Sequence, residues 1–389
     1  MNENRGLNQE RCLGLACWIW IIASVLFGRT TLEGLSFLSS TLLYKLGRYA
    51  VYVLLIAIIL RYARPNTQKR FWIMFVVALA LGISLLCSKE VVLVSVLLFV
   101  CASVNARPSR IMKAYFVAHL LVLVITVFLS TIRVIDPNVM HRGETVRRTF
   151  GFIHPNAVGS ELCVLTNCYL VLRGKKLSRW EILGGYLLSL VVFLLTDCRM
   201  AFIVTVFVLS GALVVKSAKA DIVKRYLPVI TYVILGGTII ASLFFSFVDN
   251  NKFVLLNKLD VVFSYRFDYM YASFQELGVS LFGKPATANT LLDNSFARVF
   301  FINGLIPYLL FVGTCLQVTR IFVWRRNSLL LIVWCGILLS GFLENSLFRM
   351  EYNWAFLVAG SMLPRQKQRS DENLRQWAKR MLTGIWAKE

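Results

Sequence analysis

The sequence is short of acidic residues and of histidine. It has 20 Asp and Glu against 42 Lys and Arg, and only 3 His, so its formal net charge at pH 7 is +22. It also lacks four catalytic or nucleotide-binding motifs: the GxxxxGK[ST] phosphate-binding loop, the zinc motif HExxH, a CxxC pair and the GxSxG of serine hydrolases. These absences argue against ATP-driven transport, zinc proteolysis and serine hydrolysis. We predict that the protein uses no metal ion and no cofactor.

Long polar segments are also rare. Hydrophobic residues make up 58% of the 389 residues and gather in repeated runs with almost no charge, as in polytopic membrane proteins. Strand-like alternation of polar and apolar residues is missing, which argues against an outer-membrane barrel. Because no soluble domain is left to form a basic groove, we expect no nucleic acid partner despite the positive charge.

The apolar runs predict an all-α fold, a polytopic bundle of about 12 transmembrane helices in a single integral membrane domain, residues 1–389. The first run has no small-residue cleavage site, so we read it as a retained helix rather than a signal peptide. The predicted spans are residues 12–28, 42–60, 71–87, 90–106, 111–130, 156–172, 180–197, 199–216, 227–248, 297–319, 328–343 and 350–363. Several are short, the last especially, which leaves ten or eleven spans as alternatives.

Lysine and arginine predict the orientation. With the N-terminus in the cytoplasm, the basic loops at 61–70, 107–110, 173–179, 216–225 and 320–326 all fall on the cytoplasmic side. We therefore expect a multi-pass protein of the cytoplasmic membrane with both termini in the cytoplasm. Two long connections, 131–155 and 249–296, then lie outside and are expected to contain short interfacial helices. Long loops in a compact bundle are usually functional, so these two are the predicted active site.

The tail, residues 365–389, combines many basic residues with an apolar stripe of helical spacing. Such a segment is typical of a helix that lies on the cytoplasmic membrane surface, held by its apolar face and by anionic lipids. The alternative is a solvated tail.

The first external loop contains four arginines, although the positive-inside rule disfavours them there. They are Arg133, Arg142, Arg147 and Arg148. Arginine is suited to bidentate binding of phosphate oxygens, so a lipid-linked phosphate or pyrophosphate at the outer leaflet is a natural partner. Alternatively, these arginines contact lipid headgroups or pair with acidic residues of the same loop.

The stretch RRTFGFIHPNAVG, residues 147–159, contains a candidate base. His154 precedes Pro155, which favours an extended backbone, and Asn156 is suited to cap the helix that follows. His154 could accept a proton from a sugar hydroxyl near neutral pH, or it could be a hydrogen-bonding residue of a structured turn. Glu161 lies deeper, where an unpaired carboxylate is costly, so we expect it to pair with an arginine. It is a second candidate base.

Further charges lie on the later external connections. Arg199, beside an aspartate in TDCRMAF, is either a functional cation or half of a local ion pair. Arg266 begins YRFDYMYASFQELG, a predicted interfacial helix whose aromatic residues, Tyr269 among them, form either a membrane belt or a platform for sugar rings. Asp293 and Asn294 begin a spanning helix, and simple capping is the alternative to a binding role there.

Taken together, these segments resemble a known family. RRTFGFIHPNAVG before a central helix, TDCRMAF at the next external hairpin, and YRFDYMYASFQELG, LFGKP and LDNSFARVFFINGLIPYLL across a large external loop are similar to the O-antigen polymerase and ligase superfamily. The chain looks most like the Wzy-type polymerases of capsule and exopolysaccharide clusters. The resemblance covers roughly residues 140 to 345, and the order and loop placement of the motifs are more specific than any one of them.

This resemblance implies a metal-independent glycosyltransferase that joins undecaprenyl-pyrophosphate-linked repeat units at the outer face of the cytoplasmic membrane. The arginine that precedes the histidine stretch in the family corresponds to Arg148, that of the later hairpin to Arg199, and that of the large loop to Arg266. A serine is common before the second arginine, but Cys198 stands there in this chain. Gly278 follows the third arginine one residue later than in the family's pattern.

The implied reaction requires cations for the departing pyrophosphate and a base for the attacking hydroxyl. The predicted catalytic residues are Arg148, His154, Glu161, Arg199 and Arg266. The predicted substrate-binding residues are Arg142, Arg147, Asn156, Tyr269, Asp293 and Asn294. The expected partners are the lipid-linked oligosaccharide, membrane lipids, and a chain-length regulator and a flippase of the same pathway.

Two other functions remain open at this point. A ligase that transfers finished polymer to another acceptor shares the architecture and the external arginines, so the sequence separates it poorly from a polymerase. A flippase for the repeat units belongs to a different class and should concentrate polar, broken helices near the bilayer midplane in repeated halves. In this sequence the charge lies at the predicted outer surface instead.

Overall fold

The computed structural model describes residues 2–34, 39–62, 68–217, 220–288 and 290–363. The predicted tail, 365–389, lies outside the described residues. In the part of the chain that is described, seven helices are long and apolar enough to cross a membrane: Leu7–Arg29, Ser40–Tyr62, Phe71–Ser88, Pro108–Thr131, Arg179–Thr196, Asp221–Phe247 and Leu305–Trp324. Three shorter apolar helices accompany them, Val92–Ser103, Arg199–Val215 and Ser328–Leu343. The mostly helical membrane protein predicted from the apolar runs is confirmed at this level.

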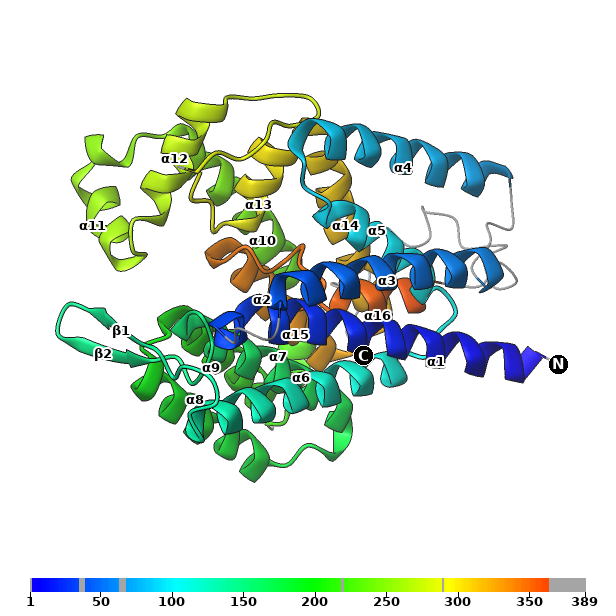
Figure 1. Cartoon of the computed structure of the whole chain (residues 1–389), viewed down its shortest axis with the longest axis horizontal. Coiled ribbons are helices and arrows are strands. Elements are labelled where there is room, and N and C mark those ends of the chain that lie inside the picture. Colours follow the sequence, from blue (N-terminus) through cyan, green and yellow to red (C-terminus); the bar gives the residue numbers. More distant parts are fainter. Residues whose placement is uncertain (1, 35–38, 63–67, 218–219, 289, 364–389) are drawn as a thin grey trace.

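The helices pack around one large apolar core (Figure 1). In chain order they are α1 (Asn2–Ile21), continued by a π-helical turn (Ile22–Leu26) into α2 (Phe27–Arg29), then α3 (Ser40–Tyr62), α4 (Gln68–Ser88), α5 (Val92–Ser103), α6 (Pro108–Thr131), α7 (Pro155–Arg173), α8 (Arg179–Thr196), α9 (Arg199–Val215), α10 (Ala220–Phe247), α11 (Val254–Val262), α12 (Arg266–Leu277), α13 (Ser295–Arg298), α14 (Leu305–Trp324), α15 (Ser328–Leu343) and α16 (Ala355–Ser361). Helix α1 packs on α3 and α6, and α15 packs on α9 and α10. Large aromatic side chains fill the centre, with Trp20, Trp334 and Trp354 almost fully buried.

Two of the predicted spans, 90–106 and 350–363, contain helices too short to cross a membrane alone. At about 1.5 Å per residue, α5 extends for about 18 Å and α16 for about 10 Å, against about 30 Å of hydrocarbon. The span predicted at 350–363 is therefore wrong as a continuous helix, since only Ala355–Ser361 is helical there. The twelve-span count stays a prediction.

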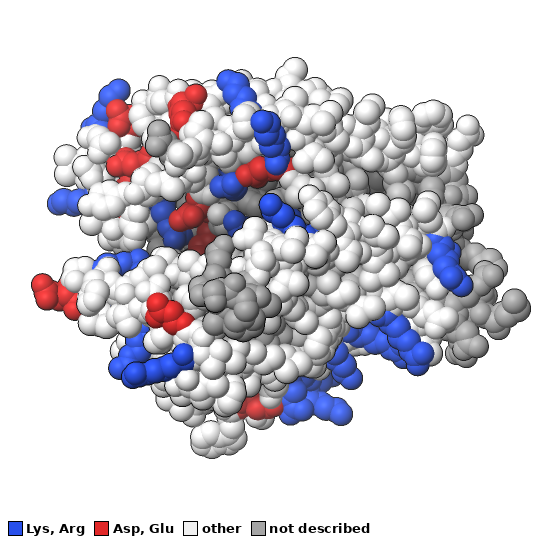
Figure 2. All heavy atoms as spheres, in the orientation of Figure 1, with Lys and Arg blue, Asp and Glu red and all other residues white. Residues whose placement is uncertain are grey.

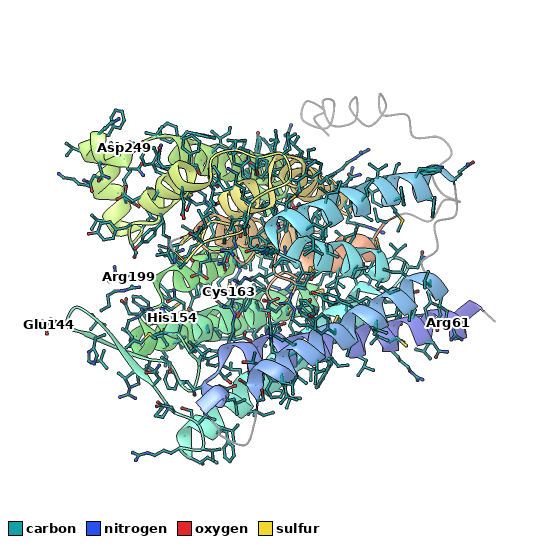
Figure 3. All side chains as sticks on the ribbon, turned by 45° about the horizontal axis from the view of Figure 1, so that its top comes forward. Arg61, Glu144, His154, Cys163, Arg199 and Asp249 are labelled. Carbon is teal, nitrogen blue, oxygen red and sulfur yellow. The ribbon has the colours of Figure 1, made fainter. Side chains whose placement is uncertain are left out.

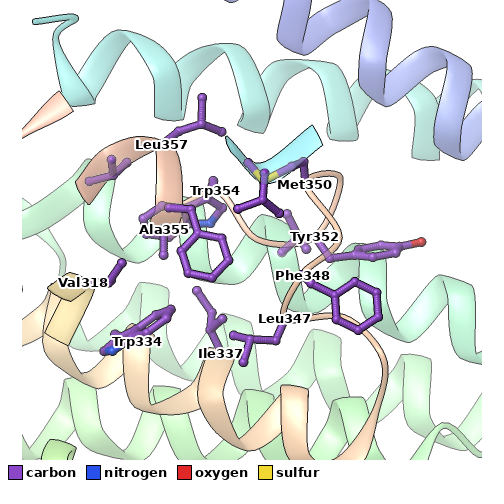
Figure 4. Close-up of a cluster of buried hydrophobic side chains, with 14 of the residues drawn as sticks. Val318, Trp334, Ile337, Leu347, Phe348, Met350, Tyr352, Trp354, Ala355 and Leu357 are labelled. Atoms are coloured by element: carbon purple, nitrogen blue, oxygen red, sulfur yellow. The ribbon is translucent and has the colours of Figure 1, made fainter. Parts of the chain in front are cut away.

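An irregular segment, residues 344–354, replaces the first part of that predicted span. Its apolar side chains, including Leu347 and Phe348, are buried against α14 and α15 in the cluster of Figure 4. The Ser295 hydroxyl donates to the Glu344 carbonyl over 2.8 Å and accepts from the Leu347 N–H over 3.1 Å. Non-helical backbone at membrane depth is tolerated where protein encloses it in this way. The segment fixes Glu344 and Tyr352 at one end of the bundle.

The first long loop contains a β-hairpin, so the short helices predicted for residues 131–155 are wrong. Strands β1 (Val139–Arg142) and β2 (Thr145–Arg148) pair in antiparallel register. Gly143, the first residue of the two-residue turn, has φ +58°, which suits a turn of type II′. After the hairpin, Phe152 bridges to Thr30 and the Ile153 N–H donates to the Arg29 carbonyl over 2.9 Å. The loop is thereby tied to the end of α2.

The second long loop contains α11 and α12, and the helix predicted to begin at Arg266 is present as α12. Its later part, residues 280–284, binds a helix that is broken at Gly304. There φ is +95°, and the N–H groups of Leu305 and Ile306 donate to the carbonyls of Ser280 and Leu281 at 2.9 and 3.0 Å. The single helix predicted for residues 297–319 is therefore interrupted. Backbone contacts satisfy the first N–H groups of α14 and hold the loop against the bundle.

Both long loops lie at the same end of the bundle, which we call the loop end. In Figure 1 the hairpin and α11–α12 occupy its left side, and the N-terminus lies at the opposite side. The surface of the loop end is hollowed between the two loops, and side chains of both charge signs line the hollow (Figure 2). We call this hollow the loop-end cleft.

Candidate functional site

Three arginines converge on one aspartate at the loop end, and we call Arg142, Arg147, Arg199 and Asp197 the Asp197 cluster. Asp197 lies in the turn between α8 and α9 with φ +46°. Its carboxylate accepts from Arg142 Nη1 at 3.2 Å and from Arg199 Nε at 3.1 Å. Its backbone carbonyl accepts from Arg147 Nη2 at 3.4 Å. Three guanidinium groups around one carboxylate leave a formal surplus of two positive charges.

The hairpin register explains which arginines join the cluster. Met140 pairs with Arg147 and Arg142 with Thr145, so Arg142 and Arg147 lie on one face of the hairpin because strand side chains alternate. Arg148 therefore lies on the other face. It is exposed and makes no ion pair with any residue that the structure describes. The sequence analysis assigned the catalytic role to Arg148 and a substrate-binding role to Arg147, whereas the structure brings only Arg147 to Asp197.

Arg147 is the most enclosed of the three, with 4% of its surface exposed. Its Nε donates to the Thr196 carbonyl at 2.9 Å, and its Nη2 donates to Asn156 Oδ1 at 2.7 Å. Burial, and next the charge of Arg142, lowers the pKa of the Arg147 guanidinium, although arginine stays charged at neutral pH. Arg147 thus joins the hairpin to α7 and α8. Arg142 and Arg199 keep 37% and 50% of their side chains exposed and can reach a ligand.

His154 is exposed at the start of α7, beside the cluster (Figure 3). Its Nδ1 accepts the Asn156 N–H at 3.1 Å, so His154 is the N-cap of the helix. The cap predicted for Asn156 is wrong, because the Asn156 side chain binds Arg147 instead. Burial, followed by the charges of Arg147 and Arg142, lowers the pKa of His154. A neutral imidazole that accepts at Nδ1 has its proton on Nε2 and presents a donor to the cleft.

Glu161 lies inside the bundle rather than at the cleft. Its Oε2 is 2.6 Å from His119 Nδ1, and both side chains are fully buried. The predicted arginine partner is therefore wrong: among the described residues, the group paired with this carboxylate is a histidine of α6. Glu161 cannot touch a substrate in the cleft in this arrangement.

A second group of charges, which we call the Glu344 cluster, consists of Arg266, Asp293 and Glu344. Arg266 Nη2 lies 3.6 Å from Asp293 Oδ2 and 3.8 Å from Glu344 Oε1. Arg266 Nη1 and Glu344 Oε1 are buried and have no hydrogen-bond partner among the described residues. Tyr269 lies one turn further along α12 and is 41% exposed. The cluster has one carboxylate more than it has guanidinium groups.

The capping role that was the alternative for Asn294 is confirmed. Its Oδ1 accepts the Ala297 N–H at 2.8 Å, and its Nδ2 donates to Ser242 Oγ and to the Phe342 carbonyl, both at 2.8 Å. The side chain is buried and fully occupied. Asp293, its neighbour, is 56% exposed and pairs with Arg266.

The sequence analysis missed Arg29, Glu344 and Tyr352. The Arg29 guanidinium lies over the Tyr352 ring, 4.9 Å from its centroid, and interacts electrostatically with Glu344. Both charged residues end apolar runs at the loop end. The positive-inside rule that drew attention to Arg147 would also have identified Arg29.

A cavity of about 30 Å³ opens beside Glu344 between α7, α9 and α15. Its polar lining residues are Glu344, Ser160, Asn167, Ser340, Ser346 and Tyr352, and the rest of the wall is formed by less polar residues such as Val164 and Ile337. Ser160 Oγ donates to the Asn156 carbonyl at 3.0 Å and lies 3.4 Å from Glu344 Oε2. The volume is enough for one or two water-sized groups, such as a hydroxyl.

In the part of the chain that is described, no group of three or more His, Cys, Asp or Glu side chains could hold a metal ion. The chain matches no protein-family model, no curated protein and no solved structure.

Proposed function

We propose that this protein polymerises lipid-linked oligosaccharide repeat units at the outer face of the cytoplasmic membrane. The observation that supports this most is the Asp197 cluster, which holds three arginines around one carboxylate at the loop end. A bundle of apolar helices gains no stability from such a surplus of positive charge, so an anionic ligand is the simplest reason for it. An undecaprenyl pyrophosphate has the required charge and arrives in the membrane.

The cluster suits a departing pyrophosphate because its cations are already oriented. Arg147 is fixed by three hydrogen bonds, to Thr196, Asn156 and Asp197. Arg142 and Arg199 are held at Asp197 through one nitrogen each, which leaves other N–H groups for phosphate oxygens. Preoriented donors stabilise charge that develops in a transition state more than mobile ones do. His154 adds an N–H donor at the same place.

The proposed topology has the loop end outside the cell and twelve crossings, with α5 and α16 as short helices enclosed by the others. The opposite end of the bundle supports it, because that end has the exposed basic residues Arg61, Arg107, Lys175 and Lys176. Basic residues on one side of the bundle mark that side as cytoplasmic.

The resemblance to Wzy-type polymerases supplies the reaction. A sugar hydroxyl of one repeat unit attacks the anomeric carbon of a second glycan and displaces undecaprenyl pyrophosphate. Arg199 and Arg266 correspond to the family's later arginines, and both lie at the cleft. For the first arginine the geometry favours Arg147, which is in the Asp197 cluster, over Arg148, which is on the opposite face of the hairpin.

The test is Arg199→Ala in cells whose own copy of the gene is deleted. Removing one well-placed cation is expected to lower the polymerisation rate about 100-fold or more, so that short lipid-linked repeats accumulate. Lys258→Ala is the matched control, since Lys258 is an exposed cation of α11 at the same end. Long polymer made by Arg199→Ala at normal expression would refute the role of the cluster.

The same experiment addresses the alternatives. In a deletion strain, short lipid-linked repeats exposed outside indicate a polymerase, whereas unattached long chains indicate a ligase. Repeats that stay inside indicate a flippase. Arg199 and His154 lie at one end of the bundle rather than midway along it, which favours the first two (Figure 3).

A further inference from the structure

The proposed reaction needs a base, and the structure argues against both candidates from the sequence. His154 Nδ1 accepts a backbone N–H, so the neutral ring has its proton on Nε2 and cannot accept another there. Glu161 is fully buried and bonded to His119. A general base must come within hydrogen-bond reach of the proton that it removes. Neither side chain meets this requirement.

Glu344 meets it. The residue follows the last turn of α15, and its carboxylate lines the cavity that opens beside it. Oε2 lies 3.4 Å from the Ser160 hydroxyl, which also contacts the Asn156 carbonyl, whereas Oε1 has no hydrogen-bond partner among the described residues. A carboxylate oxygen without a partner is costly in a buried place and is often retained for a functional reason.

We infer that Glu344 is the general base of the transfer reaction, and that the cavity of Ser160, Ser346 and Tyr352 receives the acceptor hydroxyl. This inference rests on the proposed function and identifies a residue of that same site. Arg266, whose Nη2 lies 3.8 Å from Glu344 Oε1, keeps the carboxylate ionised and in place.

Charged and titratable groups surround Glu344 on several elements. Those that interact with it electrostatically are Arg29 of α2, Cys163 of α7, Cys198 of the α8–α9 turn, Arg266 of α12, Asp293 before α13 and Tyr352 of its own segment. Burial raises the pKa of Glu344, Arg266 and Arg29 oppose that rise, and Asp293 adds to it. A carboxylate with a raised pKa is a stronger base, and flanking cations favour its ionised form.

The step balances without a further reactant. The acceptor oxygen forms a bond to the anomeric carbon of the donor glycan as its proton passes to the Glu344 carboxylate. The bond from that carbon to the pyrophosphate oxygen breaks, and its electron pair leaves with the lipid pyrophosphate beside the Asp197 cluster. Glu344 then returns the proton to water through the cleft. The protein forms no covalent intermediate.

The experiment uses the full-length protein in lipid vesicles, with lipid-linked repeat units extracted from cells that lack the gene. Glu344→Gln keeps the side chain's size, and we expect its kcat to be about 100-fold or more lower with little change in KM. Glu344→Asp keeps the carboxylate and should retain more activity than the glutamine variant. In the wild type, the rate should fall as pH falls through the Glu344 pKa, and this fall should be absent in Glu344→Gln.

Glu351→Gln is the matched control. Glu351 is a buried carboxylate of the same segment, but it accepts from Trp20 Nε1 rather than lining the cavity. The Glu351→Gln variant should keep the pH profile of the wild-type rate. If the wild type elongates the repeats and Glu344→Gln keeps its kcat, the assignment of Glu344 is wrong and the proposed function stands. If folded wild-type protein elongates nothing, the proposed function itself is wrong.

Discussion

The Asp197 cluster and the Glu344 cluster lie at the same end of the bundle but have opposite surplus charge. The first has three guanidinium groups for one carboxylate. The second has one guanidinium group for two carboxylates. The charges of both clusters act on His154, since Arg147 and Arg142 lower its pKa and Asp293 raises it. The two clusters are therefore parts of one site that differ in sign.

This difference corresponds to the two tasks of the proposed transfer. A leaving pyrophosphate gains negative charge and needs fixed cations, whereas an attacking hydroxyl loses a proton and needs an anion. Placing these groups in separate clusters keeps Glu344 from pairing fully with the arginines that the pyrophosphate requires. Its nearest arginine nitrogen is 3.8 Å away, beyond hydrogen-bond distance.

The largest effect is expected from removing the positive surplus. The double variant Arg142→Ala, Arg199→Ala leaves Arg147 and Asp197 with no net charge. Binding of inorganic pyrophosphate, measured by calorimetry on the purified protein, should weaken at least about 10-fold, because each lost charge-assisted hydrogen bond contributes about 1.5–3 kcal/mol. Elongation of lipid-linked repeats should fall below detection.

Glu344→Gln provides the comparison for that measurement. It removes a negative charge from the other cluster, so pyrophosphate binding should not weaken. Equal weakening in both variants would show that the two clusters act as a single anion site and would refute the division between them.

A smaller effect is expected from two substitutions that keep the charge, Arg147→Lys and Arg148→Lys. A lysine at 147 cannot bind both Thr196 and Asn156 as the guanidinium does. We expect it to cost about 1–3 kcal/mol of stability in thermal unfolding and to reduce elongation. Arg148→Lys, on the exposed face, should change stability by less than about 0.5 kcal/mol. If Arg148→Lys lowered the stability more than Arg147→Lys, the hairpin register would have to be shifted by one residue.

Much of this architecture could be predicted from the sequence because apolar runs are long and directly visible. The bundle, the position of both long loops at one end, and the interfacial helix at Arg266 follow from hydropathy and charge. Irregular elements packed among the helices are harder to predict. The segment 344–354 and the break at Gly304 are apolar like their surroundings, and distant partners such as Ser295 and Ser280 satisfy their backbones.

The site was predicted in its residue types but not in their partners. Arg147 and Arg148 are indistinguishable in sequence, and a hairpin register places them on opposite faces. Glu161 was expected to find an arginine, yet its partner His119 comes from another helix. Glu344 was missed because one carboxylate at the end of an apolar run resembles any polar helix terminus. Its importance follows from Arg266 and Ser160, which are distant in sequence.

The smallest predicted effect is a shift in the titration of His154, which reports on both clusters at once. Burial and the charges of Arg147 and Arg142 lower its pKa, whereas Asp293 raises it. Arg142→Ala should therefore raise the His154 pKa, and Asp293→Asn should lower it further. With three histidines in the chain, one of them fully buried, the imidazole signal can be followed by NMR across pH. Because the folded-state pKa is below the unfolded value of about 6.5, the neutral ring stabilises the fold above that pH. That contribution is lost as pH falls from the unfolded value toward the folded one. Shifts of the same sign in both variants would show that His154 does not lie between clusters of opposite charge.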